Sequence, residues 1–186
     1  ERLITRRTRV VVVVHYAGVA CDMDAILDVA ARHHLIVVED AAQAIDSFYY
    51  SKKRQRWLVL GSIGHFGCFS FHETKNIISG EGGMLSVNDE SFVRRAEIIW
   101  EKGTNRSQFF RGEIDKYGWV DLGSSFLPSE IVAAFLWAQL ENLDAIQRKR
   151  RSLWNQYAER FACCSKSVPF SLPTLPEYAT NNAHMF

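Results

Sequence analysis

The chain has 186 residues, of which 47% are hydrophobic and 23% charged, and this balance is typical of a folded domain with a sizeable core. Its net charge of +1 gives no reason to expect a nucleic-acid partner, and its densest basic stretch, QRKRRSLW at 147–154, fits the solvated face of a helix. The longest apolar run, VVVVV at 10–14, is too short to span a bilayer, and the first residues lack a signal-peptide pattern. We therefore expect a cytoplasmic protein without a membrane partner.

The cysteines show no spacing typical of a metal site or of a disulfide framework. Two of them are neighbours in the chain, and neighbouring cysteines rarely pair with each other. We expect all of them to be reduced and no metal to be bound. They are Cys21, Cys68, Cys163 and Cys164.

The first predicted elements form a strand–helix–strand unit. The β-branched run at 9–14 fits a strand buried on both faces. Asp22 fits the N-cap of a helix whose apolar residues recur at helical spacing, and LIVVED at 35–40 fits a second buried strand that ends in two carboxylates. A helix that joins two strands over so short a distance makes them parallel, so their carboxyl ends share one edge of the sheet.

The middle of the chain predicts two more strands. Residues 48–64 are polar and basic in their centre and predict an excursion over the surface. HFGCFSF at 65–71 and GGMLSVND at 82–89 fit a third and a fourth strand. The expected architecture is therefore an α/β fold around a mostly parallel sheet.

The last third of the chain is mainly helical. DESFVRRAEIIWEKG at 89–103 predicts a helix with an aspartate cap and a terminal glycine. The segment at 104–126 mixes aromatic and charged residues without a period and predicts a long, partly ordered loop. Residues 128–161 have a helical pattern throughout, with Pro128 in the first turn.

Several side chains that can carry chemistry follow the predicted strands. Asp40 and His15 lie at strand ends, where open α/β sheets bind ligands. Lys75 lies between the end of a strand and the glycine-rich turn GEGG at 80–83. A solvated lysine and an ordinary strand-end carboxylate remain open as alternatives at this point.

The ordered set VVEDAAQA, FSFHETKN, GEGG, GTNRSQFFRG and DLGSSF resembles the DegT/DnrJ/EryC1/StrS sugar aminotransferases, which act on nucleotide-linked keto-sugars with pyridoxal 5'-phosphate. Each motif alone is weak, but together they are specific, and the resemblance extends through YATNNAHMF at the end of the chain. It implies a fold type I transferase that works as a homodimer or a higher homo-oligomer. Residues 1–145 would be the C-terminal part of the large domain, and 146–186 a linking helix with an incomplete small domain.

The resemblance also implies roles for single residues. Lys75 would hold the cofactor's aldehyde and move the proton between the substrate and the cofactor. Asp40 would keep the pyridine nitrogen protonated, Gln43 would pack by the ring and its phenolic oxygen, and Ser70 would contact the phosphate.

The expected substrates are a nucleotide-linked 4-keto-6-deoxy sugar, such as dTDP-4-keto-6-deoxyglucose, and glutamate as the amino donor, for the synthesis of surface polysaccharide. His15 either lines the substrate pocket with Tyr16 or is a hydrogen-bonded histidine at a strand end. Basic residues of the long loop either bind the diphosphate, because guanidinium groups suit phosphate geometry, or belong to a solvated loop. They are Lys102, Arg106 and Arg111.

Two alternatives compete with this reading. A dehydratase-like variant of the same fold would carry another residue, typically histidine, in place of Lys75, so the lysine argues against it. The other alternative is a catalytically incomplete remnant that acts only in interactions. We expect the chain to be part of a longer protein, because the resemblance places its start inside the large domain.

Overall fold

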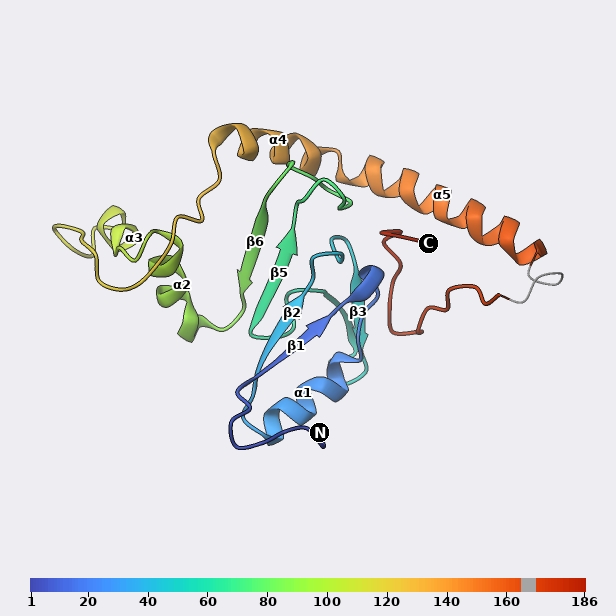
Figure 1. Ribbon diagram of the computed structural model, residues 1–186, viewed down its shortest axis with the longest axis horizontal. Coiled ribbons are helices and arrows are strands. Elements are labelled where there is room, and N and C mark those ends of the chain that lie inside the picture. Colours follow the sequence, from blue (N-terminus) through green and yellow to red (C-terminus); the bar gives the residue numbers. More distant parts are fainter. Residues whose placement is uncertain (165–169) are drawn as a thin grey trace.

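The computed structural model describes residues 1–164 and 170–186, and a four-stranded sheet forms its centre (Figure 1). The strand order is β1-β2-β5-β6. The first three strands run parallel, and β6 is antiparallel to β5. The sheet is therefore mixed but mostly parallel, as the sequence predicted. Its strands are β1 (Val10–Val14), β2 (Ile36–Asp40), β5 (Phe66–Ser70) and β6 (Gly83–Val87).

The predicted strand–helix–strand unit is confirmed. The helix α1 (Met23–Arg32) joins β1 to β2, and the Asp22 side chain caps it by accepting a hydrogen bond from the backbone N–H of Ala25 at 3.2 Å. The main hydrophobic core includes residues of β1, α1 and β2, among them Val13, Met23 and Val37. This unit fixes the position of the carboxyl ends of β1 and β2.

The expectation that β1 is buried on both faces was wrong. Val10, Val12 and Val14 are exposed, with Val12 61% accessible, whereas Val13 between them is buried. Successive side chains of a strand point to opposite faces, so one face of β1 packs on the core and the other is open among the described residues. A run of valines cannot distinguish a strand covered on one face from a strand covered on two.

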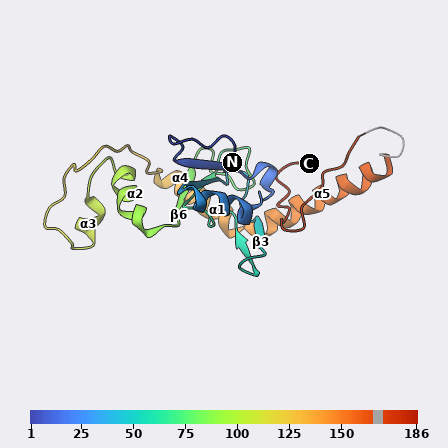
Figure 2. The same cartoon turned by 90° about the horizontal axis from the view of Figure 1, so that it is seen from below.

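The predicted excursion at 48–64 contains an unpredicted hairpin of β3 (Phe48–Ser51) and β4 (Arg56–Val59), which projects from the sheet (Figure 2). Its base is buried, because Tyr49 and Leu58 belong to the core. Its basic tip is exposed. The charged residues of the tip hid the strand alternation on either side of it.

After β6, a short 3₁₀ turn leads into α2 (Val93–Trp100), and Asp89 accepts a hydrogen bond from the N–H of Ser91 at 2.9 Å. The long segment that follows contains one short helix, α3 (Arg106–Phe110). The predicted continuous helix is two helices, α4 (Glu130–Glu141) and α5 (Leu143–Cys164), which meet at Asn142. Ser129 is the N-cap of α4, so Pro128 precedes the helix instead of lying in its first turn.

The end of the chain returns to the body of the fold. Residues 170–186 run back alongside α5 toward the loops that follow β2 and β5 (Figure 1). Arg150 of α5 donates hydrogen bonds to the carbonyls of Ala183 and His184 at 3.1 and 2.9 Å. Within the described residues, no helix is both long enough and apolar enough to cross a membrane.

Candidate active site

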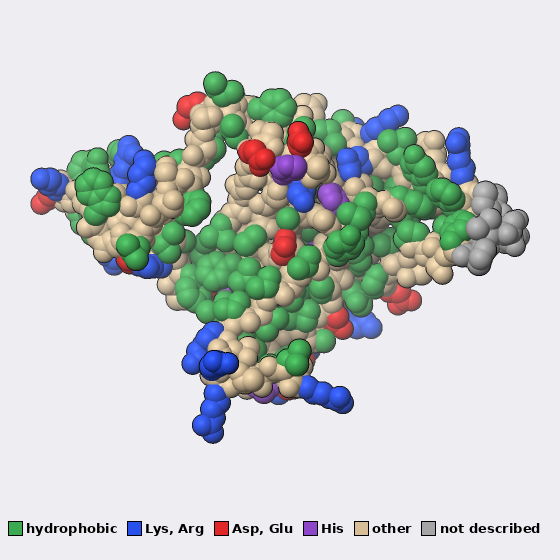
Figure 3. Space-filling view, viewed as in Figure 1, with side chains coloured by type: hydrophobic (Ala, Val, Ile, Leu, Met, Phe, Trp, Pro, Cys, Tyr) green, Lys and Arg blue, Asp and Glu red, His purple; other side chains and the backbone are tan. Residues whose placement is uncertain are grey.

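The carboxyl ends of the three parallel strands meet at one edge of the sheet. Val14 lies opposite Asp40, and Asp40 lies opposite Cys68, so Asp40 occupies the middle of this edge. Figure 3 shows Lys or Arg, His, and Asp or Glu side chains clustered on one face of the molecule, next to a broad hydrophobic surface. The site predicted from strand ends is therefore a real juxtaposition in the fold.

Lys75 belongs to the loop that connects β5 to β6. The loop is closed at its base, since the N–H of Ser79 donates to the carbonyl of Phe71 at 2.7 Å and the N–H of Lys75 donates to the carbonyl of His72 at 2.9 Å. The side chain of Lys75 is partly buried, and its Nζ has no hydrogen-bond or ion-pair partner among the residues described. An amine held this way is available to a ligand.

Asp40 presents a partly exposed carboxylate at the end of β2. Its Oδ1 accepts a hydrogen bond from the N–H of Ala42 at 3.1 Å, which orients the group. In the described part of the chain, the other oxygen has no partner. Burial and the negative charge of Asp40 raise the pKa of the nearby Cys68 thiol.

Two further predicted residues lie on the same edge. The Ser70 hydroxyl accepts a hydrogen bond from the N–H of His72 at 3.3 Å, which leaves its own proton free to donate. The Gln43 side chain accepts from the N–H of Ala17 at 2.6 Å and so ties the loop after β2 to the turn after β1. The structure therefore brings Asp40, Gln43, Ser70 and Lys75 to one edge.

His15 lies beneath this edge, in the second of the two arrangements left open by the sequence. It is fully buried, and its Nε2 lies 3.0 Å from Oε2 of Glu39. Its Nδ1 accepts from the N–H of Cys21 at 3.2 Å, so Nε2 carries the proton and donates it to the carboxylate. Tyr16, by contrast, is 67% exposed.

Glu39 is a positioning residue that the sequence analysis missed. Its buried carboxylate accepts hydrogen bonds from the backbone N–H groups of Gly61, Ile63 and Gly64 at 2.9, 2.6 and 2.7 Å, in addition to the bond from His15. Burial raises the pKa of Glu39, but these donors outweigh burial and bring it below its usual value. Since adjacent strand residues face opposite ways, the anchored Glu39 turns Asp40 toward the other side of the sheet. The adjacent carboxylates in VVED were the available signal.

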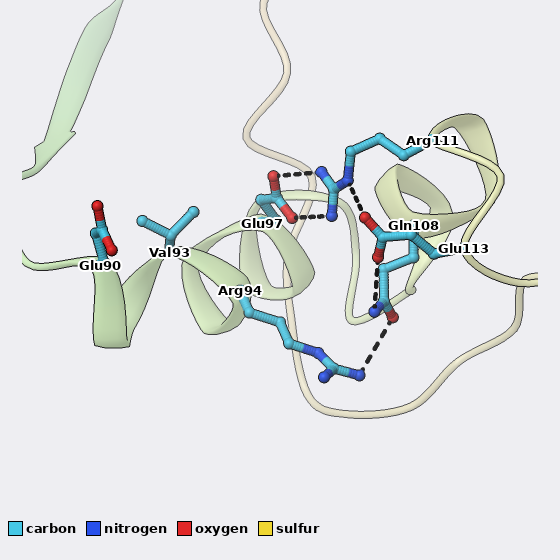
Figure 4. Close-up of a pocket in the computed structure, with 7 residues that line it drawn as sticks. All are labelled: Glu90, Val93, Arg94, Glu97, Gln108, Arg111 and Glu113. Atoms are coloured by element: carbon cyan, nitrogen blue, oxygen red, sulfur yellow. Dashed lines mark hydrogen bonds and ion pairs between the residues drawn. The ribbon is translucent and has the colours of Figure 1, made fainter.

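The basic residues predicted for the diphosphate lie apart from the strand ends, around α2 and α3 (Figure 1). Arg111 is held by two glutamates: it donates to Glu97 at 2.8 and 3.1 Å and to Glu113 at 2.6 Å (Figure 4). These ion pairs raise the pKa of Arg111 and occupy both sides of its guanidinium group. Arg106 lies over the ring of Phe110, 4.9 Å from its centroid.

Arg106 also borders a separate hollow. Besides Arg106, the hollow is lined by a second cationic side chain, by aromatic side chains and by a carboxylate. These are Lys102, Tyr117, Trp119 and Glu101. In the described structure, the buried Nε of Arg106 and Oε2 of Glu101 have no hydrogen-bond partner. This hollow therefore contains one buried donor and one buried acceptor that are available to hydrogen-bond a ligand.

The residues of the strand edge fit pyridoxal 5'-phosphate. The set combines an amine without a partner, a carboxylate with an open oxygen and a hydroxyl free to donate, as an aldehyde, a pyridinium nitrogen and a phosphate require. The individual roles of these residues stay predictions. No cluster of His, Cys, Asp or Glu suited to a metal ion occurs in the described residues. Cys21 and Cys68 are free, and the side chains of Cys163 and Cys164 lie outside the described part.

The chain belongs to the DegT/DnrJ/EryC1/StrS aminotransferase family, whose sequence model matches residues 1–186. The chain is 34% identical over 186 residues to GDP-perosamine synthase of Caulobacter vibrioides, and the match covers all of this chain and 45% of that protein. It is 37% identical over 164 residues to the spore coat polysaccharide biosynthesis protein SpsC of Bacillus subtilis, across 87% of this chain and 41% of the relative.

A solved structure agrees with this assignment. The aminotransferase from Psychrobacter cryohalolentis superposes with a TM-score of 0.84 at 29% identity, over 97% of this chain and 47% of that one. The predicted fold type and family are therefore confirmed. The chain spans less than half the length of the two curated relatives.

Proposed function

We propose that the complete protein is a pyridoxal-phosphate-dependent aminotransferase that transfers an amino group from glutamate to a nucleotide-linked 4-keto-6-deoxy sugar. The observation that carries this proposal is the meeting of Lys75 and Asp40 at one sheet edge, in a chain of this family. An intact lysine, carboxylate and serine in their expected places also argue against an inactive remnant.

In this proposal each residue at the edge has a separate task. The cofactor, when bound, withdraws electrons from the substrate carbon that exchanges its amino group. Lys75 would hold the cofactor covalently and, once displaced, would move the proton between that carbon and the cofactor. Asp40 holds a proton on the pyridine nitrogen through its negative charge, and Ser70 donates a hydrogen bond to the phosphate.

We infer that the sugar substrate is dTDP-4-keto-6-deoxyglucose and that the product is a dTDP-4-amino-4,6-dideoxy sugar, with dTDP-4-amino-4,6-dideoxygalactose as the first candidate. The motif set supports a nucleotide-linked substrate, and the relatives named for perosamine and for spore coat polysaccharide support a role in making surface polysaccharide. Arg106 and Lys102 are the better candidates for the diphosphate, because Arg111 is already paired with two glutamates.

We also propose a homo-oligomeric, cytoplasmic protein in which residues 1–145 belong to the large domain and 146–186 form a linking helix and part of the small domain. Helix α4 supports the oligomer. Its apolar side chains are exposed on several sides, including Ile131 at 83% and Trp137 at 65%. Exposed apolar area of this kind marks an interaction surface.

The substrate assignment has a direct test. The complete protein with pyridoxal phosphate and glutamate should convert dTDP-4-keto-6-deoxyglucose to its 4-amino product, and should do so with a higher kcat/KM than for the GDP-linked 4-keto-6-deoxy sugar. Chromatography with mass spectrometry measures both products. A preference for the GDP-linked sugar would overturn the dTDP assignment, and no turnover of either sugar would overturn the proposed reaction.

Replacing Asp40 with asparagine should lower turnover far more than cofactor occupancy. The amide keeps the shape of the side chain but removes the charge that holds the ring nitrogen protonated, and an ionic interaction of this kind is worth about 1.5–3 kcal/mol, or roughly 10- to 150-fold in rate. Occupancy is read from the visible absorbance of the bound cofactor, and turnover from product formation. Equal turnover in Asp40→Asn would show that another group faces the nitrogen.

A further inference from the structure

A buried polar cluster links the Lys75 loop to the end of the chain. Asn76, which follows Lys75, is 4% exposed, and its Nδ2 donates to the carbonyl oxygen of Asn182 at 2.9 Å and to Oε1 of Gln147 at 2.9 Å. The side chain of Asn182 in turn donates to the carbonyl of Gln43 at 2.7 Å. The cluster therefore connects the loops after β2 and β5 with α5 and residues 182–184.

The cluster fixes which ring nitrogen of His184 carries a proton. The carbonyl of Asn182 can only accept, so the Asn76 amide must direct its NH₂ group there and its Oδ1 toward Nδ1 of His184, 2.8 Å away. His184 Nδ1 is therefore the donor. In the neutral ring, Nε2 is left with a lone pair, for which the described residues supply no partner.

Gln147 supports the same orientation independently. Its Nε2 donates to the Asp46 carboxylate at 3.2 Å and also to the carbonyl of Asn182 at 3.3 Å, so its Oε1 must face Asn76. Asp46 is also paired with Arg151. The carbonyl of Asn182 and the carboxylate of Asp46 can only accept hydrogen bonds. They therefore determine the orientation of the Asn76 and Gln147 side-chain amides, and the orientation of Asn76 determines the tautomer of His184.

The charges that face His184 are positive. Burial, Lys75 and Arg150, in that order, lower the pKa of His184 below its usual value. Arg150 is already occupied by the carbonyls of Ala183 and His184, whereas the Lys75 amine has no partner in the described structure. A neutral imidazole with an open nitrogen thus lies within the electrostatic reach of a free amine.

We propose that His184 is a positioning residue for Lys75: Asn76 holds its Nδ1–H, and its Nε2 accepts a hydrogen bond from the lysine amine once the substrate has displaced that amine from the cofactor. The bond keeps the amine directed toward the sheet edge between the proton-transfer steps. The inference rests on the proposed function of Lys75. Protonation of His184 removes the acceptor and places a second cation beside the amine, so the arrangement works above the pKa of His184 and fails below it.

The test is ¹⁵N NMR of the complete, cofactor-free protein with labelled histidine. The neutral form of His184 should carry its proton on Nδ1, and its pKa should lie below 6.5. In Lys75→Met the tautomer should persist while the pKa of His184 rises, because a positive charge is removed. Lys52→Met, at the exposed tip of the hairpin, is the matched control and should leave the pKa of His184 unchanged. An Nε2–H tautomer, or a pKa that Lys75→Met leaves unchanged, would overturn the proposal.

A second variant separates positioning from structure. His184→Gln keeps a hydrogen-bonding side chain but cannot titrate, so kcat should fall by up to about 100-fold, and the decline of kcat at acid pH that we expect of the wild type should be absent from this variant. An unchanged acid limb would contradict the proposal, and if this variant does not fold, the NMR result on the wild type decides. If borohydride fails to trap the cofactor on Lys75, the proposed function is wrong, even if the pKa of His184 depends on Lys75. If the cofactor is trapped on Lys75 but the pKa of His184 does not depend on it, only the role of His184 is wrong.

Discussion

Replacing Lys75 with alanine should reduce transamination by the complete protein by about three orders of magnitude or more, because the variant loses the group that both holds the cofactor and moves the proton. The free energy of unfolding should change by less than about 1 kcal/mol, because Nζ makes no hydrogen bond in the described structure. Product formation and denaturant unfolding of the same preparations measure the two effects separately.

Chemical trapping gives the matching positive result. Borohydride reduction of the cofactor-loaded protein should leave a pyridoxyl group on the peptide that contains Lys75. Lys52, at the exposed tip of the hairpin, is the matched control, and Lys52→Ala should keep both the adduct and the activity. An adduct found only on Lys52, Lys53 or Lys102 would refute the assignment of Lys75.

The largest stability effect is expected at Glu39. In Glu39→Ala the backbone N–H groups of Gly61, Ile63 and Gly64 and the ring of His15 lose a common acceptor while they remain buried. Unsatisfied buried donors of this kind should cost about 3–5 kcal/mol of the free energy of unfolding. Urea denaturation of the complete protein measures it. Glu39→Gln keeps the volume and one acceptor oxygen, so its loss should be smaller; equal stability of Glu39→Ala and the wild type would contradict the account.

The same carboxylate predicts how stability depends on pH. Its pKa is lower in the folded protein than the usual value of 4.5, so the folded state binds this proton more weakly than the unfolded chain does. The stabilisation is complete above the unfolded pKa and is lost as the pH falls through the folded pKa. Between pH 6 and pH 3 the wild type should therefore lose more stability than Glu39→Gln, measured as the urea midpoint at each pH.

Local sequence signals were sufficient to predict the parallel pairing of β1 with β2. A β-branched run, an aspartate cap and a second apolar run determine the β1–α1–β2 unit without distant information, and the structure confirms it. The β3–β4 hairpin was missed because its basic turn dominates the composition of a short segment, while Tyr49 and Leu58 contribute to a core formed mainly by other elements. Burial on each face of β1 likewise depends on which elements cover it, which is a tertiary property.

The candidate site could likewise be predicted only in part. Lys75 and Asp40 follow strands, so the rule that parallel strands end at one edge was enough to predict that they lie together. The contacts that hold the Lys75 loop in place could not be predicted. Asn76 meets Asn182 over 106 residues of sequence, and no local pattern in either segment indicates that contact. The pairing of Arg111 with Glu97 is also absent from any local pattern, since Glu97 lies on α2, 14 residues earlier in the chain.

The contact between Gln43 and Asn182 has a consequence for how the protein is made. The two residues are 139 positions apart, and ribosomes deliver the N-terminal partner first. At about 5–20 residues per second, the loops after β2 and β5 wait on the order of ten seconds for the segment that completes their hydrogen bonds. During that interval, polar backbone groups that are buried in the finished fold remain open to solvent, chaperones and proteases. A ribosome stalled before residue 182 would therefore hold a nascent chain whose sheet is present but whose lysine loop is not yet secured.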